Sequence, residues 1–148
     1  MDPIRPWLFI GNYRDALNKR FLELNSIQAL LHLADVVEHP DIDVLCLPVE
    51  DMETIPPSMI RKGIEFIRTH ANQKHHILIT CGAGINRSTA YCIVALKEIE
   101  GIGLFEAYKE VKKRHYDALP NRLIWESLCE YYKESVSYLD IMKEAARN

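Results

Sequence analysis

Residues 77–100 contain a short apolar strand, a glycine-containing loop and an apolar helix, and this succession most constrains how the chain can fold. The strand is Ile77-Leu78-Ile79, ending at Thr80, and the helix runs from about Ser88 to Glu100. The loop between them is Cys81-Gly82-Ala83-Gly84-Ile85-Asn86-Arg87. A buried strand that leads directly into a helix is typical of α/β folds, which bind ligands at the carboxyl edge of the sheet. We therefore expect this loop to lie at a ligand-binding edge.

The rest of the chain alternates strands with helices in its first half and contains helices alone in its second half. Strand-length apolar runs cover residues 7–10, 29–33 and 44–49, and helical patterns cover 14–24, 56–72, 104–115 and a region starting near Arg122. This order predicts an α/β fold with a central, mostly parallel, twisted sheet of about four to five strands, flanked by helices, and a helix-rich C-terminal half. We expect residues 1–148 to form a single domain, because no repeat or linker interrupts them.

Composition and charge exclude several classes of partner. Hydrophobic residues make up 48% of the chain and charged residues 26%, as in ordinary soluble globular proteins. The net charge of −3 provides no general attraction to nucleic acid or to an anionic membrane. No apolar run approaches the ~20 residues that span a bilayer, and the acidic, proline-containing start does not resemble a signal peptide. We expect a cytoplasmic monomer without membrane or nucleic-acid partners.

The cysteines and histidines do not form a disulfide or metal pattern. Cys46, Cys92 and Cys129 lie in apolar segments, where a reduced, buried and inert thiol is the usual interpretation. Cys81 is the exception because of the loop that it begins. The adjacent pair His75-His76 lacks the i, i+4 spacing that puts two ligands on one helix face. We expect no metal and no cofactor.

The loop has the parts of a phosphate site with a cysteine nucleophile. Gly82 and Gly84 permit a tight backbone whose N–H groups turn inward, and the following helix adds the positive end of its dipole. Arg87 returns to the far side of the loop, where its planar guanidinium can bind two phosphoryl oxygens. The same positive field stabilises a thiolate at Cys81. The cysteine-to-arginine spacing alone is expected by chance roughly 0.24 times in such a chain, so the strand, glycines and helix supply the specificity.

A carboxylic acid is needed beside such a nucleophile, because attack on a phosphomonoester expels an oxygen that must be protonated. Glu50, Asp51 and Glu53 follow the predicted strand 44–49, at the same sheet edge to which the other strand delivers Cys81. We choose Asp51 as the general acid, with Glu50 and Glu53 as alternatives.

These segments resemble the dual-specificity protein tyrosine phosphatase family in its small, single-domain form, over nearly the whole chain. Trp7-Leu8-Phe9-Ile10-Gly11 is similar to the family's opening strand, and Leu47-Pro48-Val49-Glu50-Asp51 to its general-acid loop. The segment from Cys81 to Ser88 matches the C-x5-R-S signature. The resemblance implies a protein tyrosine phosphatase-like fold, with the backbone of Gly82, Ala83, Gly84, Ile85 and Asn86 binding phosphate beside Arg87.

The resemblance also assigns roles to residues around the loop. It gives the Ser88 hydroxyl a hydrogen bond to the Cys81 sulfur, although serine is also a good N-cap for the next helix. It makes Asn121 a support of the phosphate loop, although asparagine is also a preferred N-cap, and both interpretations stay open. Thr80 departs from the family, which usually has histidine immediately before the cysteine. We therefore expect activity with a less strongly activated Cys81.

The expected function is hydrolysis of phosphotyrosine, and of phosphoserine or phosphothreonine, in a protein or peptide through a phosphocysteine intermediate. The loop interior has no lysine, which disfavours a phosphoinositide headgroup. Asn86 before the arginine resembles RNA 5′-triphosphatases of the same superfamily, and that chemistry is the runner-up. A non-catalytic phosphopeptide-binding module is the alternative from another class.

Overall fold

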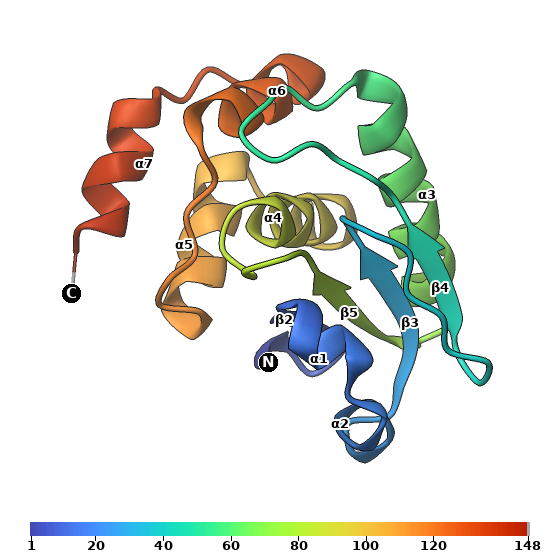
Figure 1. The fold of residues 1–148 in the computed structure, drawn as a ribbon. Coiled ribbons are helices and arrows are strands. Elements are labelled where there is room, and N and C mark those ends of the chain that lie inside the picture. Colours follow the sequence, from blue (N-terminus) through green and yellow to red (C-terminus); the bar gives the residue numbers. More distant parts are fainter. Residues whose placement is uncertain (148) are drawn as a thin grey trace.

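The computed structural model describes residues 1–147 and contains a five-stranded sheet covered by helices on both faces (Figure 1). The strands are β1 (Asp2–Arg5), β2 (Leu8–Gly11), β3 (Ile27–His32), β4 (Asp43–Cys46) and β5 (His76–Thr80), in the order β1-β2-β5-β3-β4. Strands β2, β5, β3 and β4 are parallel, and β1 pairs antiparallel with β2 at the edge. The predicted α/β fold with a mostly parallel sheet is confirmed.

Helices cover the two faces of the sheet unequally. They are α1 (Tyr13–Leu17), α2 (Lys19–Leu24), α3 (Pro57–Asn72), α4 (Arg87–Glu100), α5 (Leu104–Arg114), α6 (Arg122–Tyr132) and α7 (Tyr138–Ala145). The larger core joins Leu31, Ile77 and Ile79 to the apolar faces of the later helices. The smaller core packs Leu30 and Leu78, on the opposite sheet face, against α1 and α2. Because both faces are buried, these strands read as continuous apolar runs.

Three boundaries differ from the sequence-based expectations. The predicted helix 14–24 is two helices, because Asn18 ends α1 and its side chain accepts the Phe21 N–H at the start of α2. The predicted strand 44–49 ends at Cys46, although Leu47 N–H still donates to His32 O at 2.8 Å. Strand β1 was not predicted, because Pro3 is unfavourable inside a sheet and is tolerated at an edge.

The carboxyl end of β5 is the centre of the functional edge. β5 lies between β2 and β3, so that Thr80 is level with Gly11 on one side and with His32 on the other. The chain then leaves the sheet as a loop and enters α4 (Figure 1), whose residues from Ser88 to Leu96 are all buried. Within residues 1–147, none of the helices combines the length and the apolar character that crossing a bilayer requires.

Candidate active site

The sulfur of Cys81 lies at the bottom of the loop, against the first turn of α4. The residue is 2% exposed, and its Sγ is 3.3 Å from Ser88 Oγ. The Ser88 backbone N–H also donates to Sγ, at 3.4 Å. Helix α4 begins at Arg87 with Asn86 at the N-cap position, so the alternative interpretation of Ser88 as the helix cap is wrong. The Ser88 side chain instead faces the sulfur.

Neighbouring segments hold the loop backbone from several sides. Gly84 has a φ of +75°, and a Cβ at this position would lie 2.8 Å from Gly11 O, so the glycine is required both for its conformation and for the close approach. Tyr13 N–H donates to Gly82 O at 3.0 Å. On the other side, His115 Nε2 lies 2.6 Å from Gly84 O. The loop is thereby held between the β2–α1 turn and the end of α5.

The guanidinium of Arg87 is oriented with one edge toward the loop. Its Nη1 donates to Leu33 O at 3.1 Å and to Val49 O at 3.2 Å, which ties it to the segments that follow β3 and β4. Nε is buried and has no hydrogen-bond partner within residues 1–147. A Cβ on Gly82 would lie 3.3 Å from Nη2, so this atom runs beside the loop. The Nε–Nη2 edge is therefore available for two oxygens of a bound oxyanion.

Asp51 lies over the mouth of the loop and is connected to it through Asn86. Asn86 Nδ2 donates to Asp51 Oδ1, and Asp51 Oδ1 is 3.8 Å from Arg87 Nε. Asn86 Oδ1 accepts the Asn121 backbone N–H at 2.7 Å. The Asn121 side chain accepts the Ile124 N–H at 2.9 Å as the cap of α6. Asn121 thus contacts the loop through its backbone and caps the helix through its side chain.

Thr80 has a buried partner that the sequence did not reveal. Its Oγ1 is 2.7 Å from Nδ1 of His32, which lies level with it on β3, and both residues are fully buried. Tyr13 also approaches His32, with ring centroids 5.7 Å apart. The sequence did not indicate that three residues, His32, Tyr13 and His115, lie beside the loop. The one available signal was a histidine at the end of an otherwise apolar strand.

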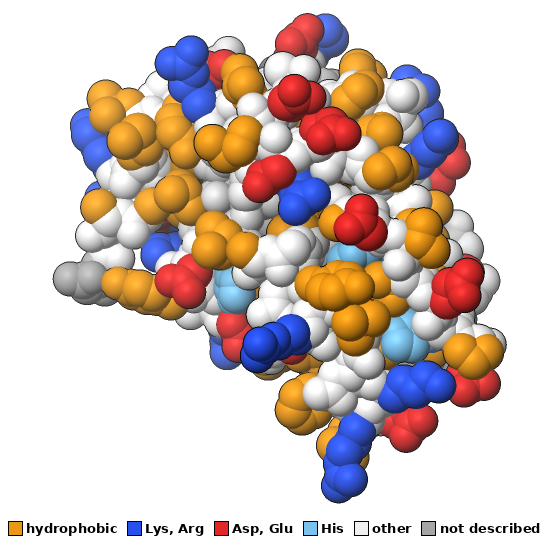
Figure 2. All heavy atoms as spheres, in the orientation of Figure 1, with side chains coloured by type: hydrophobic (Ala, Val, Ile, Leu, Met, Phe, Trp, Pro, Cys, Tyr) orange, Lys and Arg blue, Asp and Glu red, His pale blue; other side chains and the backbone are white. Residues whose placement is uncertain are grey.

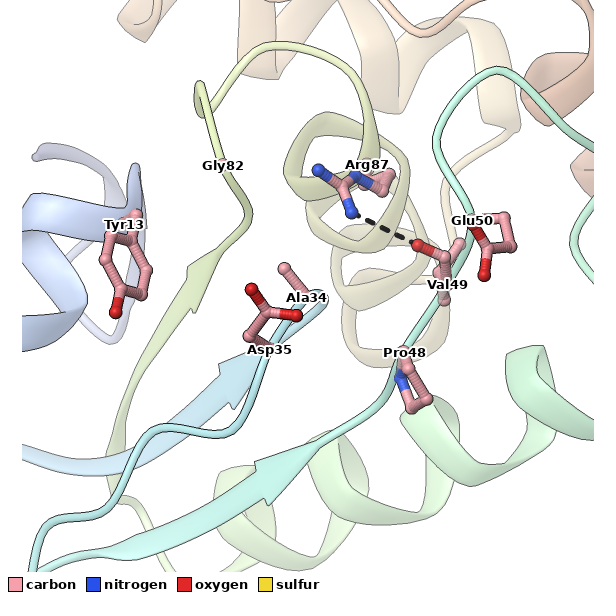
Figure 3. A pocket seen from close by; sticks show the side chains of 8 residues that line it. All are labelled: Tyr13, Ala34, Asp35, Pro48, Val49, Glu50, Gly82 and Arg87. Atoms are coloured by element: carbon pink, nitrogen blue, oxygen red, sulfur yellow. Dashed lines mark hydrogen bonds between the residues drawn. The ribbon is translucent and has the colours of Figure 1, made fainter.

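Two cavities meet at Arg87. The first, of about 360 Å³, opens above the nucleophile, with lining residues Asp51, Met52, Cys81, Ala83, Ile85, Asn86, Arg87, Leu119, Asn121 and Tyr138. The second, of about 500 Å³, shares Arg87 with the first and is shown in Figure 3, with lining residues Tyr13, Ala34, Asp35, Pro48, Val49, Glu50, Gly82 and Arg87. The surrounding face carries acidic, basic and hydrophobic side chains interspersed rather than one continuous basic surface (Figure 2). The first cavity is the candidate reaction site because Cys81, Asp51 and Arg87 all line it.

The other three cysteines are not among the residues that line the reaction cavity. All four are free, and Cys92 is fully buried, which raises the pKa of its thiol. Burial also raises the pKa of Cys129, which is half-buried, and Cys46 Sγ contacts the backbone of Val37. Among residues 1–147, no three histidine, cysteine or acidic side chains gather as candidate metal ligands.

Comparison with known proteins assigns the chain to a family. The model of the dual specificity phosphatase catalytic domain matches residues 8–134, which include Asp51, Cys81 and Arg87 but not Tyr138 of the reaction cavity. The chain belongs to the dual specificity phosphatase family. Human dual specificity protein phosphatase 16 is 31% identical over 137 residues, which are 88% of this chain but only 20% of that protein. The chain thus spans about a fifth of the length of this family relative.

Solved structures of the family agree with the fold. Human DUSP28 superimposes with a TM-score of 0.83 at 22% identity, covering 90% of this chain and 96% of that one. The human tyrosine phosphatase-like serine/threonine/tyrosine-interacting protein gives a TM-score of 0.80 at 25% identity, covering 90% and 95%. The predicted phosphatase-like architecture is therefore confirmed.

Proposed function

We propose that this domain hydrolyses phosphotyrosine, and also phosphoserine or phosphothreonine, in proteins through a phosphocysteine intermediate. One observation carries the proposal: the Cys81 sulfur lies 3.3 Å from Ser88 Oγ beneath a loop whose Arg87 has a buried Nε with no hydrogen-bond partner within residues 1–147, the Asp51 carboxylate being 3.8 Å away. A buried guanidinium N–H without a hydrogen-bond partner is costly unless a ligand satisfies it. A phosphoryl group has the charge and the oxygen spacing to do so.

The first chemical step transfers the phosphoryl group to sulfur. The Cys81 thiolate attacks phosphorus, the S–P bond forms and the bond to the leaving oxygen breaks. Loop N–H groups and Arg87 stabilise charge on the equatorial oxygens. Asp51, protonated at this stage, gives its proton to the leaving oxygen, so that a neutral alcohol or phenol departs.

The second step returns the enzyme to its starting state. Asp51, now a carboxylate, accepts a proton from water, whose oxygen attacks phosphorus as the S–P bond breaks. The Ser88 hydroxyl, 3.3 Å from Sγ, donates to the sulfur as it leaves as a thiolate. Inorganic phosphate is released, and neither a metal nor another cofactor takes part in the proposed cycle.

The walls of the reaction cavity favour an aromatic leaving group. Met52, Ile85, Leu119 and Tyr138 surround the entrance with apolar surface, which can contact the ring of phosphotyrosine. Phosphoserine and phosphothreonine offer the same phosphoryl group with less apolar surface. We therefore expect phosphotyrosine peptides to have the higher kcat/KM.

The test is a hydrolysis panel with matched variants. Wild type, Cys81→Ser and Asp51→Asn are assayed on phosphotyrosine and phosphothreonine peptides, a phosphoinositide and triphosphate-ended RNA. We expect phosphopeptide turnover in wild type, loss in Cys81→Ser, and a reduction in Asp51→Asn that is largest on poor leaving groups. Unchanged turnover in Asp51→Asn would transfer the acid role to Glu50 or Glu53.

The remaining alternatives are outcomes of the same panel. Exclusive hydrolysis of RNA would favour the triphosphatase. The presence of asparagine at position 86 does not require that activity, since its side chain bridges Asp51 and Asn121. Phosphopeptide binding without any turnover would favour a binding module. The presence of both a held thiol and a nearby carboxylate argues against that module.

The proposal extends to the state of the protein in the cell. We take residues 1–148 as one catalytic domain that acts as a monomer in the cytoplasm. The four free cysteines support a reducing compartment, because thiols stay reduced there. Light scattering after size-exclusion chromatography tests the monomer, and fractionation of cells tests the location.

A further inference from the structure

The end of β3 contacts the residue before Cys81 and the guanidinium of Arg87 through consecutive residues. His32 Nδ1 is 2.7 Å from Thr80 Oγ1, and Thr80 directly precedes Cys81. Leu33 N–H donates to Thr80 O at 2.8 Å, while Leu33 O accepts from Arg87 Nη1 at 3.1 Å. One short segment therefore connects the strand that delivers the nucleophile with the arginine opposite it.

His32 is poorly explained as a stability residue. Its side chain is fully buried, and Nε2 has no hydrogen-bond partner among residues 1–147. A buried unpaired nitrogen weakens a fold, so an apolar residue of similar shape would serve packing better. The contact that His32 does make is with the residue beside the nucleophile.

We propose that His32 is a positioning residue that holds Thr80, and through it the start of the phosphate loop, in the geometry needed for attack by Cys81. The inference rests on the proposed phosphatase function and deepens it. The contact with His32 selects one of the few rotamers open to the β-branched Thr80 side chain, because its hydroxyl then has a hydrogen-bond partner. The parallel register of β3 and β5 provides that partner.

The imidazole acts in its neutral form. Burial lowers the pKa of His32 below its ordinary value of 6.5, and the positive charge of Arg87 lowers it further, while Asp35 opposes them. The other polar neighbours are Tyr13 from α1, Thr80 from β5 and Cys46, level with His32 on β4. None of these neighbours adds a second positive charge. Because the His32 ring is neutral, the positive electrostatic potential at Cys81 comes from Arg87 and the loop N–H groups.

The experiment breaks the contact from each side. His32→Phe and Thr80→Val remove the polar partners while nearly preserving shape, whereas His32→Asn and Thr80→Ser keep an atom able to hydrogen-bond. The matched control is His70→Phe, because His70 is the other buried histidine in the described part of the chain and bonds to Asp43 and His75 away from the site. Readouts are kcat, KM, melting temperature and the rate of Cys81 alkylation by iodoacetate.

We expect His32→Phe and Thr80→Val each to lower kcat about tenfold with little change in KM, because misplacement acts on the transition state. The double variant should lose no more than either single variant. His32→Asn and Thr80→Ser should recover most of the rate. Both disruptive variants should also slow alkylation of Cys81, whereas His70→Phe should change neither kcat nor alkylation.

Two outcomes would overturn the inference. The first is unchanged kcat and alkylation in folded His32→Phe or Thr80→Val, which would leave His32 a purely structural residue. The second is an additive loss in the double variant. If His32→Phe does not fold, Thr80→Val with its serine control decides the question. If wild type hydrolyses no phosphoester, the proposed function fails separately, while the alkylation rates still test the role of His32.

Discussion

The hydrogen-bonding groups of the reactive side chains divide into those that hold the side chain in place and those that stay unused for the proposed reaction. Arg87 donates through Nη1 to two backbone carbonyls, and the proposed substrate contacts use Nε and Nη2. Ser88 offers its hydroxyl to the sulfur, because the helix starts one residue earlier and does not need it as a cap. At this scale the site is organised by which hydrogen-bonding groups remain unused.

Replacing Ser88 by alanine should affect the second step of the reaction. The hydroxyl is placed to donate to the departing thiolate, and a hydrogen bond to a charged group is worth about 1.5 kcal/mol or more, so kcat should fall at least about tenfold. Rapid-quench kinetics should show a burst of released phenol followed by slow turnover. A fall in kcat without a burst would place Ser88 in the first step instead.

Replacing Asn86 by alanine should uncouple the acid from the loop. The variant loses the bonds from Asn86 to Asp51 and to the Asn121 N–H. Each neutral hydrogen bond is worth about 1 kcal/mol, so we expect modest destabilisation and a larger loss of kcat on poor leaving groups than on an activated aryl phosphate. Equal losses on both substrates would show that Asn86 acts on the phosphate rather than on Asp51.

The elements bring their ends to one edge, where Gly84 packs closely against the backbone of Gly11. Replacing Gly84 by alanine puts a methyl group 2.8 Å from Gly11 O in a left-handed conformation, whereas the matched position Gly101 has a φ of +71° and open space around it. Gly101→Ala should cost about 1–2 kcal/mol of unfolding free energy from backbone strain alone. Gly84→Ala should cost more and should also reduce kcat, as denaturant titration and steady-state assays can measure.

The elements themselves could largely be predicted, because their apolar periodicity is local. The break between α1 and α2 could not be predicted, because the apolar pattern continues through it. It depends on the Asn18 side chain, which caps α2. The site shows the same division. Cys81, Arg87, Asp51 and Ser88 follow from one loop and one strand end, but the contact of His32 with Thr80 depends on β5 lying next to β3.

The whole molecule should lose stability on the acidic side partly through His32. Its folded-state pKa is lowered, first by burial and then by Arg87, from 6.5, so below pH 6.5 the unfolded chain binds more protons than the folded one. The contribution of His32 to the free energy of unfolding is complete above pH 6.5. It falls as the pH decreases toward the lowered pKa, by at most about 1.4 kcal/mol per pH unit. His32→Asn should therefore show a smaller drop in melting temperature between pH 7.5 and 5.5. An equal drop would assign the loss to other groups.

The hydrogen bond from Tyr13 N–H to Gly82 O makes the phosphate loop observable from a residue outside it. The exchange of that amide with deuterium requires the loop and the β2–α1 turn to separate. An oxyanion such as vanadate that draws the loop together should slow this exchange, and an NMR spectrum would resolve it as a single cross-peak. The start of the chain thus carries a spectroscopic signal of site occupancy that needs no label in the site.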